Sequence, residues 1–215
     1  MTERPKTQAS PRARKQTTEP TEDLTLLMSS KVVGQPNVIN VIVPYIEMFQ
    51  AGLAPENRPV GVFLLLGPTG TGKTRTVEAL AETIHGSARN VLKIDCGEFQ
   101  MEHEVAKLIG APPGYLGHRE TVPMLSQQKL AGVTSDKCGL SLVLFDEIEK
   151  AAPSLTRLLL GVLDRGVLRL GDNSVVNFEK SLVFLTSNLG AKEMMREINP
   201  DFGFQSATTT GRAKT

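Results

Sequence analysis

The chain has 215 residues, a formal net charge of +1, and 40% hydrophobic and 22% charged residues, a composition typical of a folded domain with a hydrophobic core. It excludes collagen, coiled coils and wholly disordered chains, and its near-neutral charge gives no overall field for nucleic acid or an anionic membrane. The two cysteines, Cys96 and Cys138, fit neither a disulfide framework nor a zinc-ligand spacing, which favours a reducing, cytoplasmic location. The longest apolar runs are far shorter than the roughly 18 residues that cross a bilayer, so we expect neither a signal peptide nor membrane contact.

Residues 1–21 are predicted to be a disordered polar tail. They contain almost nothing apolar and cannot repay the entropy of ordering. The first twenty residues carry five basic and two acidic side chains, which fits a solvated leader or an arm for nucleic acid. The lack of aromatic residues for stacking favours the leader. We expect a folded core over 22–205 and a polar C-terminal end over 206–215.

The apolar pattern then predicts helices and strands in alternation. Helical signals cover 21–30 and 37–50, and Pro44 should kink or split the second helix. A continuous apolar run predicts a buried strand at 60–66, and further strands are expected at 91–95, 140–145 and 181–186. Further helical patterns occur at 73–85, 102–108, 121–131, 154–163 and 191–197, and a hairpin with its turn at 171–173 is expected over 166–178. This alternation predicts an α/β fold with a doubly wound parallel sheet.

A glycine-rich segment between the first strand and its helix carries the strongest chemical signal. It reads Gly-Pro-Thr-Gly-Thr-Gly-Lys-Thr and matches the phosphate-binding pattern G-x-x-x-x-G-K-[ST] at every fixed position. Lys73 should reach the β- and γ-phosphates, and the Thr74 hydroxyl should bind Mg²⁺. The candidate contacts to ATP are Gly67, Pro68, Thr69, Gly70, Thr71, Gly72, Lys73 and Thr74.

Two later strands end in polar residues that suit the same site. The strand at 140–145 runs into Asp146 and Glu147, at the edge where ligands bind in open parallel sheets. Asp146 would hold Mg²⁺ through water, and Glu147 would orient or deprotonate an attacking water. The last strand leads to Asn188, whose amide would help to position that water. The sequence therefore predicts a P-loop NTPase with Lys73, Glu147 and Asn188 as catalytic residues.

These motifs resemble the AAA+ ATPases of the Clp and heat-shock unfoldase branch, most closely their C-terminal ATPase domain. The similar blocks are 32–35, 58–61, 67–74, 108–117, 144–151 and 186–190. The resemblance implies an AAA+ large subdomain in which Val32 and Val33 lie against the adenine. It also implies a pore loop in a homo-oligomeric, hexameric ring, where Tyr115 and Leu116 grip an extended polypeptide substrate.

We therefore expect ATP binding and hydrolysis coupled to the unfolding or remodelling of proteins threaded through a ring pore. A nucleic-acid remodelling or loader ATPase stays open as an alternative, although acidic residues interleave with the basic ones around the hairpin and disfavour nucleic acid as a partner. A truncated nucleotide-binding module without efficient hydrolysis is another alternative. The resemblance implies an arginine finger and a helical lid after Asn188, which the polar residues 205–215 do not supply. Because such a finger contributes about 10³- to 10⁵-fold in rate, we expect this chain alone to hydrolyse ATP slowly.

Overall fold

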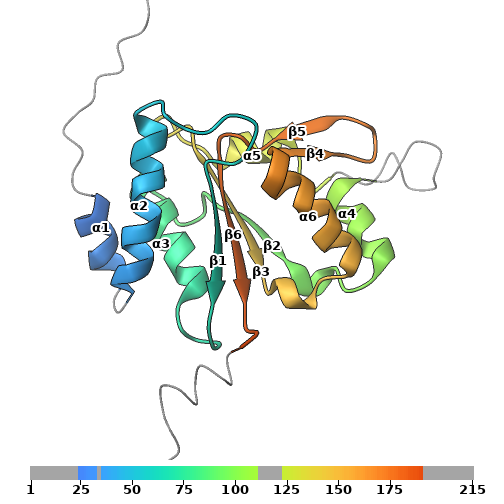
Figure 1. The fold of residues 1–215 in the computed structure, drawn as a ribbon, viewed down its shortest axis with the longest axis horizontal. Coiled ribbons are helices and arrows are strands. Elements are labelled where there is room, and N and C mark those ends of the chain that lie inside the picture. The colour runs from blue at the N-terminus through green and yellow to red at the C-terminus, as the bar shows by residue number, and fades with distance from the viewer. Residues whose placement is uncertain (1–23, 33–34, 111–122, 191–215) are drawn as a thin grey trace, which may run out of the picture.

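A four-stranded parallel sheet forms the centre of the chain, for which the computed structural model describes residues 24–32, 35–110 and 123–190. Its strands are β1 (Gly61–Leu66), β2 (Leu92–Asp95), β3 (Ser141–Asp146) and β6 (Ser181–Ser187). They lie in the order β1-β6-β3-β2, and every pairing is parallel (Figure 1). The α/β fold with a doubly wound parallel sheet that we expected is confirmed.

Helices cover both faces of this sheet (Figure 1). One face packs against α1 (Leu24–Lys31), α2 (Pro36–Gln50) and α3 (Lys73–His85). The other packs against α4 (Val105–Ile109), α5 (Gln127–Gly132) and α6 (Pro153–Arg165). Three 3₁₀ turns, η1 (Cys96–Glu98), η2 (Glu102–Glu104) and η3 (Ile148–Lys150), and the expected antiparallel hairpin of β4 (Val167–Arg169) and β5 (Val175–Asn177) complete the described elements. None of the helices in this part of the chain is long and apolar enough to cross a membrane.

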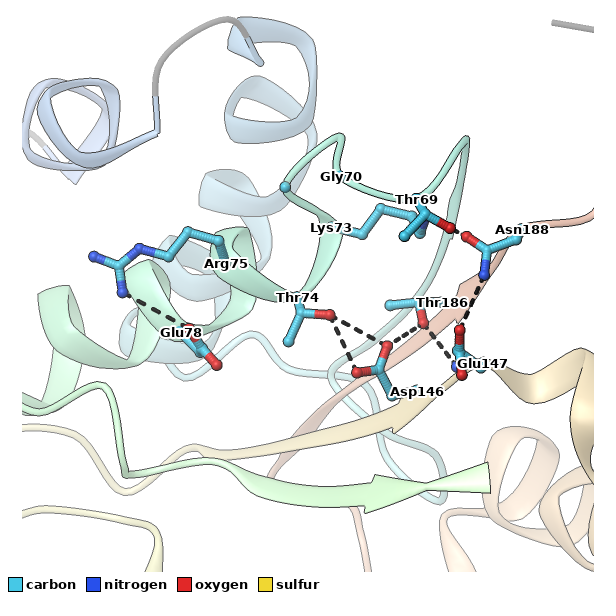
Figure 2. Close-up of a pocket in the computed structure, with 11 residues that line it drawn as sticks. Thr69, Gly70, Lys73, Thr74, Arg75, Glu78, Asp146, Glu147, Thr186 and Asn188 are labelled. Atoms are coloured by element: carbon cyan, nitrogen blue, oxygen red, sulfur yellow. Dashed lines mark hydrogen bonds and ion pairs between the residues drawn. The ribbon is translucent and has the colours of Figure 1, made fainter. Parts of the chain in front are cut away.

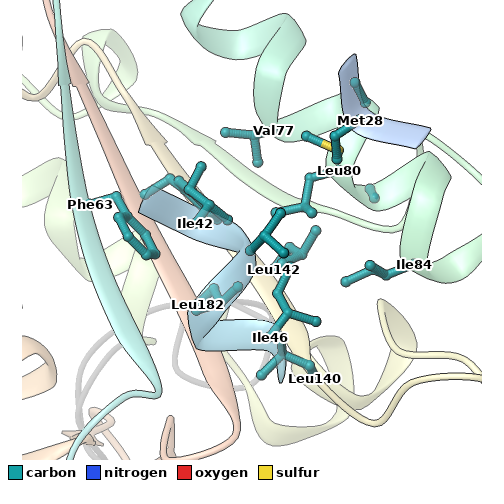
Figure 3. Close-up of a cluster of buried hydrophobic side chains, with 14 of the residues drawn as sticks. Met28, Ile42, Ile46, Phe63, Val77, Leu80, Ile84, Leu140, Leu142 and Leu182 are labelled. Atoms are coloured by element: carbon teal, nitrogen blue, oxygen red, sulfur yellow. The ribbon is translucent and has the colours of Figure 1, made fainter. Parts of the chain in front are cut away.

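The two faces arise because the chain reverses direction across the sheet. From β1 it crosses over α3 to the far strand β2, and it then returns by way of β3 and α6 to β6, beside β1. Crossovers between parallel strands keep a right-handed sense, so opposite directions of travel place their helices on opposite faces. Each face thus has its own buried cluster; Figure 3 shows the one in which Ile42 and Ile46 of α2 meet Leu142 and Leu182 of the sheet.

Two of the expected helices differ from the prediction. Of the two outcomes expected at Pro44, the split does not occur, because α2 runs unbroken from Pro36 to Gln50, and the kink stays a prediction. The proline removes one backbone hydrogen bond, but the buried side chains of Ile39, Ile42, Val43 and Ile46 anchor the turns on both sides of it. The helix expected from residue 121 begins instead at Gln127, where the Ser126 hydroxyl accepts a hydrogen bond from the Lys129 N–H and caps the first turn.

The expected burial of the first strand is correct for only one of its faces. Val62, Leu64 and Leu66 are 41%, 56% and 48% exposed, whereas Phe63 is buried. In the described part of the chain β1 is an edge strand, and its Val62 face lies beyond the elements that cover Val183 and Leu185 of the neighbouring strand. The tail expected over 1–21, the helix expected over 191–197 and the polar end over 206–215 lie outside the described residues.

The registers of the sheet bring the strand ends together at one edge. Leu66 pairs with Ser187 at the ends of β1 and β6, and Asp95 pairs with Asp146 at the ends of β2 and β3. Because all four strands are parallel, the residues that follow them emerge on the same side of the molecule. The glycine-rich loop, the acidic pair and Asn188 therefore meet there.

Candidate functional site

The glycine-rich loop connects β1 to α3 and forms an open cradle. Gly70 and Gly72 both have φ of +85°, and a Cβ atom at either position would meet nothing within 4 Å. Glycine adopts this left-handed conformation without steric cost. Inside the loop the Thr71 hydroxyl donates to the Pro68 carbonyl at 2.9 Å. The N–H groups at the start of α3 and the helix dipole there suit an anion such as phosphate.

The side chain of Lys73 folds back along this loop. Its ammonium group donates to the carbonyl oxygens of Gly67 and Pro68 at 2.7 and 2.9 Å and to Asn188 Oδ1 at 2.8 Å. These partners hold the lysine beside the cavity that Figure 2 shows. Its side-chain partner among the described residues, Asn188, comes from the end of β6, so the structure joins two residues that the sequence assigned to catalysis.

The carboxylate of Asp146 is held from several directions. The Thr74 hydroxyl lies 3.2 Å from both of its oxygens, the Thr186 hydroxyl donates to Oδ1 at 2.5 Å, and the Lys93 ammonium lies 3.1 Å from Oδ2. Burial alone would raise the pKa of Asp146, but the hydrogen bonds from Thr186 and Lys93, the charge of Lys93 and the bond from Thr74 outweigh it and lower this pKa. Asp146 is therefore a carboxylate at neutral pH.

Glu147 follows directly and turns its side chain toward Asn188. Its backbone is in the left-handed region with φ of +56°, which is uncommon outside glycine and is typical of constrained functional sites. Oε1 accepts a hydrogen bond from the Asn188 amide at 3.2 Å, and Oε2 lies 2.5 Å from the Lys150 ammonium. The Glu147 N–H is held in turn by the Thr186 hydroxyl at 2.9 Å.

Asn188 links the basic and the acidic parts of the site. Its Oδ1 accepts from Lys73 while its amide group donates to Glu147, so a continuous chain of hydrogen bonds crosses the cavity (Figure 2). Its backbone N–H donates to Glu149 at 3.0 Å, which fixes the strand end. The three residues predicted to be catalytic thus lie together, although their roles stay predictions.

Two cavities lie on either side of the glycine-rich loop. The first, of about 400 Å³, is lined by the loop, Asp146, Glu147, Asn188 and three residues that the sequence analysis had not named, which are Arg75, Glu78 and Thr186. The second, of about 380 Å³, is mainly apolar, and Gln35, Val38 and the end of β1 line it. A polar cavity for phosphates beside an apolar one for a base matches the two chemical parts of a nucleotide.

Some expected contacts are not found in these cavities. Val32 is 8% exposed and packs in the same buried cluster as Ile42 and Leu142. Gln35 and Val38 line the apolar cavity and are therefore better placed to contact the base. Val33 lies outside the described residues, as do Tyr115 and Leu116 of the predicted pore loop. The contacts proposed for these residues stay predictions.

The residues at the acidic end fit a magnesium ion. Mg²⁺ prefers oxygen ligands and keeps several waters, usually with only one or two protein carboxylates. The Thr74 hydroxyl and the Asp146 carboxylate supply such oxygens next to each other at the mouth of the phosphate cradle. They would hold the ion against the phosphates of a bound nucleotide.

The parallel sheet, the glycine-rich loop and the acidic strand end define this chain as a P-loop NTPase fold. Residues 58–213 match the family model described as AAA domain (Cdc48 subfamily), and the chain belongs to this family.

Curated relatives come from fungi and bacteria. Heat shock protein 104 of Schizosaccharomyces pombe is 37% identical over 183 residues, which are 85% of this chain and 19% of that protein. The ATP-dependent protease ATP-binding subunit-like protein AmiB of Pseudomonas aeruginosa is 41% identical over 170 residues, 79% of this chain and 45% of that protein. The ATP-dependent Clp protease ATP-binding subunit ClpC of Staphylococcus aureus is 37% identical over 179 residues, 83% of this chain and 21% of that protein. The chain thus spans less than half the length of each of these relatives.

A solved structure shows the same fold. The closed-state cryo-electron-microscopy reconstruction of Hsp104 with ATPγS and FITC-casein superposes with a TM-score of 0.74 and 30% sequence identity. The match covers 85% of this chain and 31% of that one.

Proposed function

We propose that this chain binds ATP with Mg²⁺ and hydrolyses it as the ATPase core of a protein-remodelling machine. The observation that carries the proposal is the hydrogen-bonded chain from Lys73 through Asn188 to Glu147, beside the Thr74–Asp146 pair, around one polar cavity. The names of the relatives support it, since ClpC is an ATP-binding subunit of an ATP-dependent protease and Hsp104 was imaged with ATPγS and casein.

The residues of the site divide the work between binding and chemistry. Lys73 exchanges its loop and Asn188 partners for phosphate oxygens, and the N–H groups of the loop and α3 bind the same phosphates. Mg²⁺, when bound, neutralises negative charge that develops on the phosphate oxygens. Glu147 accepts a proton from the attacking water, and the Asn188 amide, already in contact with Glu147, holds that water in line.

Coupling to a substrate is the finer part of the proposal. Release of Lys73 from Asn188 changes the hydrogen bonding at the end of β6 and gives the chain two states that depend on the γ-phosphate. We propose that this change moves the Tyr115–Leu116 loop against a polypeptide in a homo-oligomeric ring, expected to be a hexamer in the cytoplasm. The casein present in the Hsp104 structure supports a polypeptide substrate.

Binding of a fluorescent ATP analogue to the purified chain, followed by single-turnover hydrolysis, tests the nucleotide assignment. Lys73→Ala should lose at least about tenfold in affinity, because a charge-assisted hydrogen bond contributes about 1.5–3 kcal/mol. Glu147→Gln should bind like the wild type and lose hydrolysis. Lys137→Ala, at an exposed lysine in the loop before β3, is the matched control. Normal ATP binding by Lys73→Ala would contradict the proposal, and binding without turnover in the wild type would reduce it to a nucleotide-binding module.

Capture of casein in the presence of ATPγS tests the substrate class. Tyr115→Ala should reduce capture, while Tyr45→Phe, at the other tyrosine, should leave it unchanged, because the Tyr45 ring packs edge-on against Phe63 away from the cavity. Equal capture by wild type and Tyr115→Ala would contradict the role of the loop. Binding to DNA that weakens steeply with salt would instead support a nucleic-acid substrate.

A further inference from the structure

Lys93 contacts the metal-side carboxylate from outside the cavity. It lies on β2 opposite Leu144 of β3, and its side chain reaches diagonally to Asp146, two residues further along. Such diagonal neighbours on adjacent strands are within reach of long side chains. The ammonium group lies 3.1 Å from Oδ2, and the side chains of Lys93 and Asp146 are 47% and 17% exposed. Lys93 therefore places a positive charge next to a carboxylate that also contacts Thr74 in the cavity.

The surroundings of Asp146 are strongly acidic. The pKa of the nearby buried Cys96 thiol is raised to about 12, first by burial and then by the negative charges of the Asp and Glu side chains around it, Asp146 among them. Two other lysines near Asp146 bond to other groups. Lys73 donates to the glycine-rich loop and Asn188, and Lys150 donates to Glu147. Within the described residues, the cation that an ion pair places on Asp146 is Lys93.

We propose that Lys93 is a positioning residue that compensates Asp146 until nucleotide arrives, and that it thereby prevents the site from binding free divalent cations. Thr186 holds one oxygen of the carboxylate and Lys93 holds the other, so the group keeps its orientation toward Thr74 without a metal ion. A hydrated cation gains little binding free energy from a carboxylate whose negative charge is already neutralised by a neighbouring lysine. The phosphates of ATP bring the negative charge that makes Mg²⁺ binding favourable, so metal and nucleotide bind together.

This inference rests on the proposed function only in taking Thr74 and Asp146 as the metal side of the site. Its physical content is the effect of one positive charge on a neighbouring ion. A charge within about 4–6 Å typically changes the equilibrium of an ionised group by one to three tenfold steps. Because Lys93 is about half exposed and solvent screens part of its charge, we expect the lower end of that range, about tenfold.

The test measures Mn²⁺ binding to the full chain without nucleotide, from the electron paramagnetic resonance signal of free Mn²⁺. Lys93→Met should bind Mn²⁺ about tenfold more tightly than the wild type, and Lys93→Arg, which keeps the charge, should behave like the wild type. Lys137→Met removes an equal charge from an exposed loop and should change nothing. Adding Thr74→Val to Lys93→Met should abolish the gain, because the ion would lose its hydroxyl ligand.

Three results would each contradict the role of Lys93. The proposal is overturned if Lys93→Met binds Mn²⁺ no more tightly than the wild type, if Lys137→Met gives the same gain, or if the gain survives Thr74→Val. Lys93→Gln provides a second neutral variant should Lys93→Met lose its cooperative thermal transition. ATP binding by the wild type and Lys73→Ala, measured separately, tests the proposed function independently of this result.

Discussion

Thr186 offers a sharp test of how the acidic end of the site is held. Its side chain is 1% exposed, its hydroxyl donates to Asp146 Oδ1 at 2.5 Å, and it accepts the Glu147 N–H at 2.9 Å. Thr186→Val keeps the shape of the side chain and removes both hydrogen bonds. The variant therefore measures the bonds themselves rather than the packing of β6.

The expected loss follows from the two partners left behind. A hydrogen bond to a charged group contributes about 1.5–3 kcal/mol net, and a buried N–H without a partner costs about 1–3 kcal/mol. Because Glu147 is of intermediate burial rather than fully buried, we take the second cost at its low end. We expect Thr186→Val to destabilise the fold by about 2.5–4 kcal/mol at neutral pH. For a chain of this size that lowers the Tm by roughly 5–15 °C.

The loss should also depend on pH. The pKa of Asp146 in the folded chain is lowered below its ordinary value of 3.8, so its ionised form stabilises the fold above that value. This stabilisation is lost as the pH falls through the lowered folded pKa. Because the charge-assisted part of the Thr186 bond disappears with it, the difference between Thr186→Val and wild type should be smaller at about pH 3 than at pH 7.

Urea unfolding followed by circular dichroism at both pH values provides the measurement, since the chain has no tryptophan for fluorescence. Thr83→Val is a matched control. Its hydroxyl donates to the Ala79 carbonyl of its own helix, which leaves no charged group behind when it is removed. A loss under about 0.5 kcal/mol for Thr186→Val, or one that is equal at both pH values, would refute this account of Asp146.

Two further predictions concern Lys150, whose removal should have little effect on stability, and Cys96, which should not react in the folded chain. Lys150→Met removes an ion pair of 2.5 Å with Glu147, but Lys150 is 48% exposed and exposed pairs add little stability; we expect an unchanged Tm in thermal denaturation, and a clear drop would show that the pair is shielded from solvent. Cys96 is fully buried and its pKa is raised to about 12 by burial and neighbouring carboxylates, so at pH 8 it should react with a thiol reagent only after unfolding, whereas rapid labelling of the native chain would contradict the structure.

Most of the sheet could be predicted because its signals are local. β1, β3 and β6 are short apolar runs, and β3 and β6 are buried on both faces as central parallel strands are. The errors come from tertiary context. Whether Pro44 breaks a helix depends on the packing of Ile42 and Ile46, and whether Leu64 is buried depends on which elements lie beside β1. Neither is contained in the periodicity of the segment itself.

The candidate site also combines residues that a local motif predicts with residues that only the tertiary structure brings together. The loop 67–74 and the Asp146–Glu147 pair stand out because ligand chemistry demands specific residue types at fixed spacing. Thr186 and Lys93 carry no such signature, since a threonine or a lysine in a strand has many ordinary uses. Their roles arise from the register of the sheet, which brings Lys93 and Thr186 to Asp146 from the strands on either side.

That register nevertheless provides a rule that could have found them. In strands of period two, residues i and i+2 point to the same face. Leu142 and Leu144 pack in the cluster that includes α3, and Asp146 continues that face toward the loop. Side chains that share this face on the neighbouring strands, directly opposite the strand end or diagonal to it, are therefore within reach of its side chain. Lys93, which lies opposite Leu144, and Thr186 both lie on this face beside Asp146. The partners of a ligand-binding carboxylate therefore follow from strand pairing once the order of the sheet is known.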